Sequence, residues 1–121
     1  MAATGIILYA HGSSDPCWHE AVEAIAAAVR ARAPATLVRC AYLERSTPDL
    51  MGAASELIAA GAGAIRVLPL LLGAGRHLHA DIPCQIEAVR RAHPATALHL
   101  LPMAGEYAQV HALLADIALN G

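Results

Sequence analysis

The stretch GIILYAHGSSDP, residues 5–16, joins the end of one secondary-structure element to the start of the next. Its first six residues are almost continuously apolar, which is typical of a strand covered on both faces of a sheet. Asp15 and Pro16 then supply a helix N-cap and a first-turn proline. A buried strand, a short polar loop and a helix therefore follow one another, and His11 lies where the strand meets the loop.

The same alternation continues along the chain. Apolar runs at 36–43, 64–72 and 96–103 predict three further strands. Helical spacing of apolar residues predicts a helix after each run, and the starts of the second and third helices are expected at Thr47-Pro48 and at Asp81-Ile82-Pro83. Pro69 lies inside the third run, so we expect a bulge, a strand end or a sheet edge there.

This order of elements predicts the fold class. Strands that alternate with helices through short connections form βαβ units, with a parallel sheet between layers of helices. We therefore expect an α/β fold, a three-layer αβα sandwich around a four-stranded, mainly parallel sheet related to the flavodoxin-like folds. The pattern also divides into two βαβα halves, as an internal duplication would. At 121 residues, the chain has the length of a single domain, 1–121.

Composition excludes several classes of function. Hydrophobic residues make up 57% of the chain, the formal net charge is −2 and aromatic residues are only 3%, so we expect no nucleic-acid partner. The N-terminal MAATGIILYAHG has no basic region, and its apolar run is too short for a signal peptide or a membrane span. The three cysteines are widely spaced and odd in number, which favours reduced thiols in the cytoplasm.

Candidate functional residues collect at one edge of the predicted sheet. In open parallel sheets, ligands bind beyond the carboxyl ends of the strands. His11 follows the first strand, Glu44 follows the second, and the loop GAGRHLHADIP, residues 73–83, follows the third. Glu44 at this edge can orient an imidazole or accept a proton, and it can equally be a solvated loop charge.

Other catalytic and metal motifs are missing from the sequence. It contains no G-x-S-x-G elbow, no phosphate-binding glycine loop after a strand and no H-E-x-x-H. The pair His77-x-His79 aligns its side chains only in an extended segment, so we assign no metal to His79. His11 and His77, one from each loop, are too few for a closed metal site. Two such ligands suit an open site, which a metal ion enters and leaves.

Three segments together resemble a known family. ILYAHGSSDP (7–16), AYLERSTPDL (41–50) and VLPLLLGAGRHLHADIP (67–83) are similar to the signature segments of the small class II tetrapyrrole chelatases. These CbiX- and SirB-type enzymes insert cobalt, iron or nickel into sirohydrochlorin. The specific feature is the combination of H-G-S after the first strand with G-x-G-x-H-x-x-x-D-I-P after the third. The fourth segment, PMAGEY (102–107), matches the family ending only loosely.

The resemblance implies roles for particular residues. The family's two metal-binding histidines fall on His11 and His77, and Glu44 matches an acidic position that is common in the family. Gly12, Ser13, Gly73 and Gly75 line the two loops. The substrate is a polycarboxylate, and Arg45 and Arg76 are the candidates to pair with its side chains by their loop positions. Similar short proteins form homodimers that complete the cleft, so we expect a homodimer.

The expected activity is the ATP-independent insertion of a divalent metal, most simply Co²⁺, into sirohydrochlorin. His11 and His77 would hold the metal on one side of the tetrapyrrole, and an imidazole or Glu44 would take the two pyrrole protons. We expect no cofactor beyond the substrate metal. Three alternatives remain: a chelatase for Fe²⁺ or Ni²⁺, a metal or tetrapyrrole carrier without turnover, and a generic flavodoxin-like binding domain with structural histidines.

Overall fold

The computed structural model describes residues 3–121, except the side chain of His77. Its elements follow one another as β1 (Ala3–Ala10), the 3-10 helix η1 (Pro16–His19), α1 (Glu20–Arg32), β2 (Leu37–Tyr42), α2 (Leu50–Ala59), β3 (Ala62–Pro69), α3 (Arg76–Ala92), β4 (Ala97–Leu100), the 3-10 helix η2 (Ala104–Glu106) and α4 (Ala108–Asn120). This order confirms the α/β class and the two βαβα halves predicted from the sequence.

The four strands form one sheet in the order β2-β1-β3-β4, and every neighbouring pair is parallel. The register aligns Ala10 with Tyr42 and Tyr9 with Pro69, so the carboxyl ends of β1, β2 and β3 lie at one edge. Pro69 is the last residue of β3, which is one of the three alternatives expected for it, and a proline there removes no hydrogen bond from the interior of the ladder. The edge that carries His11 and Glu44 is therefore formed as expected.

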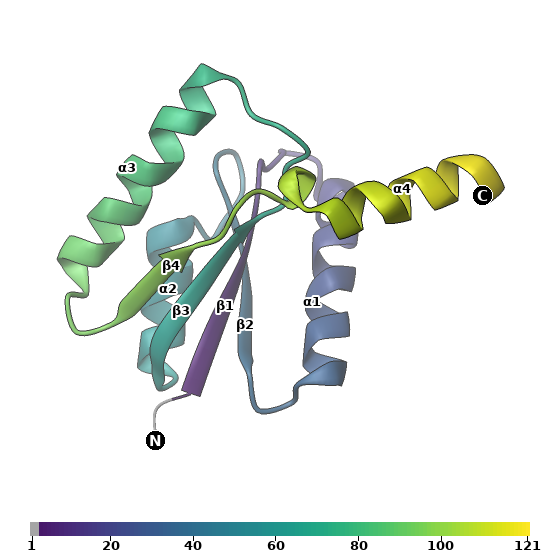
Figure 1. Ribbon diagram of the computed structural model, residues 1–121. Helices are drawn as coiled ribbons and strands as arrows, with labels where there is room; N and C mark the ends of the chain where they lie inside the picture. The colour runs from purple at the N-terminus through teal and green to yellow at the C-terminus, as the bar shows by residue number, and fades with distance from the viewer. Residues whose placement is uncertain (1–2) are drawn as a thin grey trace.

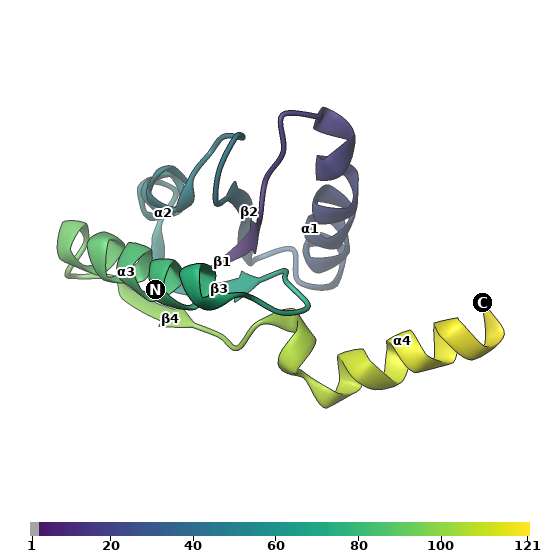
Figure 2. The ribbon, with the colours of Figure 1, turned by 90° about the horizontal axis from the view of Figure 1, so that it is seen from above.

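Helices cover the two faces of the sheet unequally (Figures 1 and 2). On one face α1 buries Val22 and Ala26 against Leu8, Val38 and Cys40. On the other face α2 and α3 pack side by side over a larger apolar cluster, which includes Ile7, Leu57, Ile65, Val67 and Ile86. The last helix, α4, leads away from the sheet and does not join either layer (Figure 2).

The first helix starts where its sequence signal predicts, whereas α2 begins at Leu50, three residues after the expected Thr47, because Asp49 and not Thr47 is its N-cap. The Asp15 carboxylate accepts a hydrogen bond from the Cys17 N–H at 3.0 Å, and Pro16 is the first residue of η1. Asp49 caps α2 by accepting from the Gly52 N–H at 2.8 Å. Each carboxylate satisfies an N–H that has no partner within its own helix.

The expected start of the third helix at Asp81-Ile82-Pro83 is wrong. The helix α3 begins at Arg76, where Gly75 is the N-cap and its carbonyl accepts from the His79 N–H at 3.1 Å. Pro83 therefore lies inside the helix and leaves the His79 carbonyl without its usual i+4 donor. The early start extends the apolar stripe to Leu78, which packs on the core with Ile82, and this burial offsets the lost bond.

Within residues 3–121, none of the helices combines the length and the apolar character that a membrane crossing requires. The cytoplasmic location expected from the cysteines stays a prediction.

Candidate functional site

The candidate site lies at the carboxyl edge of the sheet, where the loops after β1 and β2 run side by side. The Leu43 N–H donates to the Ala10 carbonyl at 2.9 Å, and the Glu44 N–H donates to the His11 carbonyl at 3.1 Å. The parallel hydrogen-bond ladder thus continues past the ends of both strands. These two bonds hold His11 and Glu44 next to each other on a fixed backbone.

Gly12 is the residue that allows this close approach. Its φ is +97°, and a Cβ atom added there would lie 1.9 Å from the Glu44 carbonyl oxygen. A side chain would therefore separate the two loops, and it would also be strained by the left-handed backbone. The glycine of the H-G-S motif thus has a structural reason in the contact with the loop after β2.

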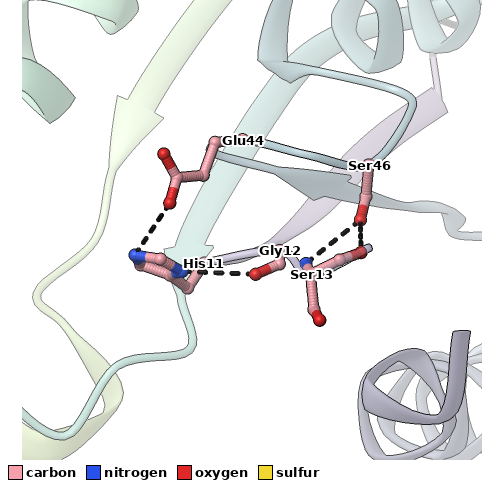
Figure 3. Close-up of polar contacts among 5 residues, drawn as sticks. All are labelled: His11, Gly12, Ser13, Glu44 and Ser46. Carbon is pink, nitrogen blue, oxygen red and sulfur yellow. Dashed lines mark hydrogen bonds and ion pairs between the residues drawn. The ribbon is translucent and has the colours of Figure 1, made fainter. Parts of the chain in front are cut away.

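His11 and Glu44 form an exposed pair (Figure 3). His11 Nε2 is 3.5 Å from Glu44 Oε1, and the two side chains are 56% and 52% exposed. His11 Nδ1 is 3.3 Å from the Gly12 carbonyl oxygen. When Nδ1 carries the hydrogen and donates to that carbonyl, Nε2 presents its lone pair beside the carboxylate. The pair then offers two adjacent electron-pair donors to a proton or a metal ion, and both are open to solvent.

Ser46 fixes the neighbouring part of the loop (Figure 3). Its hydroxyl donates to the Ser13 carbonyl at 2.5 Å and accepts from the Ser13 N–H at 3.2 Å. His19 Nε2 lies 2.9 Å from the same oxygen. A hydroxyl has one donor and two acceptor positions, so this set of partners makes His19 Nε2 a donor. The network ties the loop after β1 to the loop after β2 and to η1.

The imidazole of His19 also stacks on Tyr42, with ring centroids 4.4 Å apart. Burial raises the pKa of Tyr42 to about 12, and the nearby Cys40 and Glu23 add to this rise. The Tyr42 hydroxyl therefore keeps its proton at physiological pH. The stacked pair forms one wall of the hollow that His11 also lines.

Two hollows open along this edge. The first, of about 440 Å³, is lined by Ala10, His11, Gly12, Ser13, Trp18, His19, Val22, Tyr42 and Leu70. The second, of about 360 Å³, lies between α3 and the segment after β4, and Leu78, His79 and Glu106 are among its lining residues. His11 lines the first hollow, and the 72% exposed ring of Trp18 lies on its rim. A concave surface with a few polar groups is what a small-molecule site requires.

The structure brings together only some of the predicted residues. His11, Gly12, Ser13 and Glu44 meet as described, and Arg45 follows Glu44 with a φ of 60° and an exposed side chain. Gly73 is exposed in the loop after β3, and Gly75 and Arg76 are the N-cap and first residue of α3. Among the described residues, no hydrogen bond or ion pair links Arg45 or Arg76 to His11.

The second predicted histidine, His77, has its backbone in the first turn of α3, and its side chain lies outside the described residues. Because residues 76–79 are helical, the extended pairing that His77-x-His79 would need is not formed. Among the side chains that the structure describes, no three histidine, cysteine or carboxylate groups converge to hold a metal.

Sequence reasoning assigned nothing to His19 and did not consider Trp18 or Ser46 as site residues. All three belong to the wall or the loop network beside His11. No motif could have indicated them, because Ser46 reaches Ser13 only through the pairing of β1 with β2.

The comparison with family models gives a match to CbiX over residues 5–119. The chain belongs to the CbiX family. This match extends through β4 and α4, beyond the three segments that carried the resemblance in the sequence. The glycine of the loosely matching PMAGEY segment, Gly105, also has a structural reason, since a Cβ there would lie 1.8 Å from the Leu72 carbonyl oxygen.

Individual relatives agree with the family. A sirohydrochlorin cobaltochelatase of Sulfolobus acidocaldarius is 37% identical over 83 residues, which are 69% of this chain and 66% of the relative. A cobalamin (vitamin B12) biosynthesis CbiX protein from Marinobacter aquaeolei, known from a crystal structure, is similar to this chain with a TM-score of 0.83 at 32% identity. The match covers 96% of this chain and 94% of that one.

A longer protein of known structure shares the fold. The sirohydrochlorin chelatase SirB of Bacillus subtilis subspecies spizizenii, solved in complex with cobalt, has a TM-score of 0.71 at 24% identity. The match covers 81% of this chain and 42% of SirB. This chain therefore corresponds to less than half of SirB, and its match spans about two thirds of the Sulfolobus relative.

Proposed function

We propose that this protein is a sirohydrochlorin metal chelatase that inserts a divalent metal ion, with Co²⁺ as the first candidate, as a single chelatase domain over residues 1–121. The observation that carries the proposal is the His11–Glu44 pair at the carboxyl edge of the sheet, 3.5 Å apart, in which His11 also lines a hollow of about 440 Å³. Membership of the CbiX family and similarity to cobaltochelatases support it.

In the proposed reaction, the metal ion is a substrate held between the protein and the tetrapyrrole. His11 Nε2 and His77 bind the metal on one side of the ring. Two imidazoles leave most of its coordination positions open, so the pyrrole nitrogens can replace the remaining ligands. Exposure of the His11 side chain suits this role, because the metal must reach the site and then leave it with the product.

Insertion also requires that two pyrrole protons leave. Glu44 is placed to accept a proton, since its Oε1 lies beside His11 Nε2 and its side chain is half exposed to solvent. A proton taken at this position passes directly to water. His11 is the other candidate for the base, and the same geometry serves both assignments.

The carboxylate side chains of sirohydrochlorin need cationic partners. Arg45 lies in the loop after β2 and Arg76 is the first residue of α3, on the same edge as His11, and both are exposed. Their guanidinium groups can form paired hydrogen bonds to carboxylates. The loops after β1 and β3 carry four small residues, which would leave room for the macrocycle: Gly12, Ser13, Gly73 and Gly75.

The test is anaerobic incubation of the protein with sirohydrochlorin and Co²⁺, Fe²⁺ or Ni²⁺ in turn, followed by absorbance. We expect multiple turnovers that are abolished in His11→Ala and His77→Ala and retained in His93→Ala. His93 is a matched control, because it lies at the opposite end of α3 and contacts Ser55. The metal that is inserted fastest indicates which tetrapyrrole pathway the protein suits best.

A different outcome would favour the second candidate function. Stoichiometric binding of metal or tetrapyrrole with no acceleration over the protein-free rate would identify a carrier. Normal turnover in His11→Ala would overturn the proposed site while leaving the family assignment unchanged.

A further inference from the structure

Trp18 is the exposed aromatic ring of this chain. All four aromatic residues, three tyrosines and one tryptophan, lie in the described part of the chain. Tyr9 and Tyr42 are 1% and 3% exposed and Tyr107 is half-buried, whereas Trp18 is 72% exposed. A single exposed apolar residue needs no explanation by itself, so the surroundings of this ring decide what it means.

The indole ring stands between two hollows at the functional edge. It lines the hollow of about 440 Å³ together with His11. It also lines a further hollow of about 280 Å³ with Cys17 and Ala21. The ring therefore packs on little of its own chain, and a molecule that enters the first hollow meets it next to the candidate metal ligand.

The hollow beside His11 has a polar end and an apolar side. The polar end belongs to the loop after β1, with His11, Gly12 and Ser13. The apolar side, which leads to Trp18 on the rim, is formed mainly by residues of α1, β2 and the segment after β3: Val22, Tyr42 and Leu70. This division suits a ligand with a flat apolar body and polar groups at its periphery, as in a tetrapyrrole with carboxylate side chains.

The backbone that carries Trp18 is fixed on both sides. The Trp18 N–H donates to the Asp15 carbonyl at 3.1 Å, and the Asp15 N–H donates to the Ser13 hydroxyl at 3.1 Å. The next residue, His19, is held by its 2.9 Å contact with the Ser46 hydroxyl. Because the loop is already ordered, a ligand that contacts the ring loses little affinity to ordering of the backbone.

An indole offers a tetrapyrrole two kinds of contact. Its face can stack on a pyrrole ring, and its N–H can donate to a carboxylate. In the proposed reaction the macrocycle lies over His11, so its periphery extends toward the rim of the hollow that His11 and Trp18 share. Arg45 and Arg76 can bind only the carboxylates, whereas Trp18 can bind the ring itself.

We propose that Trp18 is a stacking platform that positions the tetrapyrrole over His11. The inference rests on the proposed function and adds to it a residue that binds the substrate ring but neither binds the metal nor accepts a proton. The stacking contact is equally present before and during metal insertion. It therefore contributes to the affinity for the substrate and not to the rate of the bound complex.

The first test separates binding of the ring from binding of the metal. Trp18→Ala should raise the Kd of metal-free sirohydrochlorin about tenfold, measured by anaerobic absorbance titration. It should leave the affinity for Co²⁺, measured without tetrapyrrole, unchanged. His11→Ala should have the opposite pattern, with weakened Co²⁺ binding and retained sirohydrochlorin binding.

Two further variants refine this comparison. Trp18→Phe keeps an aromatic face and should lose less affinity for sirohydrochlorin than Trp18→Ala. Ile25→Ala is the matched control, because Ile25 is a 41% exposed apolar residue of the adjoining α1 that lines a different hollow. Its Kd should equal that of the wild type. Each of these side chains is exposed, so the variants should retain the fold, and thermal unfolding checks this.

Turnover gives a second readout that a merely structural role would not produce. In the chelatase assay, Trp18→Ala should raise the KM for sirohydrochlorin about tenfold and leave kcat within about twofold, because a contact made equally in both states affects only binding. A high concentration of sirohydrochlorin should therefore restore the rate of Trp18→Ala. The same concentration should not restore His11→Ala.

The contact itself can be observed without turnover. The chain contains a single tryptophan, so one indole N–H signal in a ¹H–¹⁵N spectrum reports on this ring. Metal-free sirohydrochlorin should shift that signal in the wild type and in His11→Ala alike. An unshifted signal in a protein saturated with sirohydrochlorin would contradict the platform.

The outcomes separate this inference from the proposed function. Normal sirohydrochlorin affinity in Trp18→Ala, beside normal turnover of the wild type, would overturn the platform and leave the proposed function intact. Equal losses of Co²⁺ and sirohydrochlorin binding would show that Trp18 only supports the loop, and would also overturn it. So would a change in sedimentation at unchanged ring affinity, which would place the indole in a contact between copies of the chain. A wild-type protein that binds no sirohydrochlorin would overturn both proposals.

Discussion

His11 Nε2 lies 3.5 Å from Glu44 Oε1, although the two residues belong to loops after different strands. The pairing of Ala10 with Tyr42 brings the two strand ends level, and two further backbone bonds carry the alignment into the loops. Gly12 then permits contact with the Glu44 backbone. The candidate donor pair is thus a product of strand register and of one glycine.

Replacing Glu44 with glutamine tests the role of the carboxylate. We expect Glu44→Gln to weaken Co²⁺ binding and lower turnover by about 10- to 100-fold, because in the proposed site the carboxylate beside the metal-binding His11 loses its charge. Stability should change by less than about 0.5 kcal/mol, since the side chain is exposed. Cobalt titration and the absorbance assay measure the effect. Glu56→Gln, which loses a surface pair with Arg39, is the control and should be active. Equal activity of both variants would show that Glu44 is only a solvated charge.

Adding a methyl group at Gly12 should be more costly than at Gly61. Both glycines have positive φ, +97° and +108°, but only Gly12 has an atom within 4 Å of the new Cβ. We expect Gly61→Ala to cost about 1 kcal/mol for the backbone alone. Gly12→Ala should cost at least about 2 kcal/mol, because strain and the clash with the Glu44 carbonyl are added. Urea unfolding of the two variants compares them directly. Similar losses would mean that the loops separate without cost.

The Ser46 hydroxyl should matter more for stability than its neighbours in the loops. Ser46→Ala leaves the Ser13 N–H, the Ser13 carbonyl and the His19 ring without their partner. Because these groups are only part-buried, we expect a loss of about 1–2 kcal/mol. Ser14→Ala, at an exposed position, should change stability by less than about 0.5 kcal/mol. Thermal unfolding distinguishes the two, and an unchanged Tm in Ser46→Ala would contradict the role of the network.

The three cysteines should differ in reactivity. Cys17 and Cys84 are exposed, whereas Cys40 is buried between β2 and α1. Burial raises the pKa of the Cys40 thiol to about 12, and nearby Glu23 adds to this rise. At pH 8 a disulfide reagent should modify two thiols rapidly and the third at least about 100-fold more slowly, because the thiolate is the reactive form. Rapid reaction of all three in the folded protein would contradict the burial of Cys40.

The same shift predicts how stability depends on alkaline pH. The pKa of Cys40 is raised from 9.0 to about 12, and burial raises the pKa of Tyr9 from 10.0 to about 12. At a pH between the ordinary and the raised pKa of each group, the unfolded chain has lost a proton that the folded chain retains. The free energy of unfolding therefore falls as pH rises through this range. Stability should be fully present below about pH 9 and decline from there to about pH 12. Urea midpoints measured across this range would contradict the shifts if they stayed constant.

Several features of the fold could be predicted because they depend on residues close together in the chain. Asp15 caps the first helix through the N–H group two residues away, as its place before Pro16 indicates. Pro69 ends β3 because proline cannot donate within a ladder. The start of α3 could not be predicted in the same way. The local signal at Asp81 and Pro83 was weaker than the burial of Leu78, which depends on a core formed by distant strands.

The sequence by itself determined the order of strands and helices, the parallel sheet and the edge at which His11 and Glu44 lie, because periodicity, capping and chain handedness act over short separations. Only the tertiary structure decided that these two side chains meet, that Ser46 and His19 support the loop beside them, and that α4 leaves the sheet with large apolar residues exposed. Such contacts depend on the register of β1 with β2 and on which surfaces remain uncovered once the core is packed. Neither quantity is encoded in any single segment of the chain.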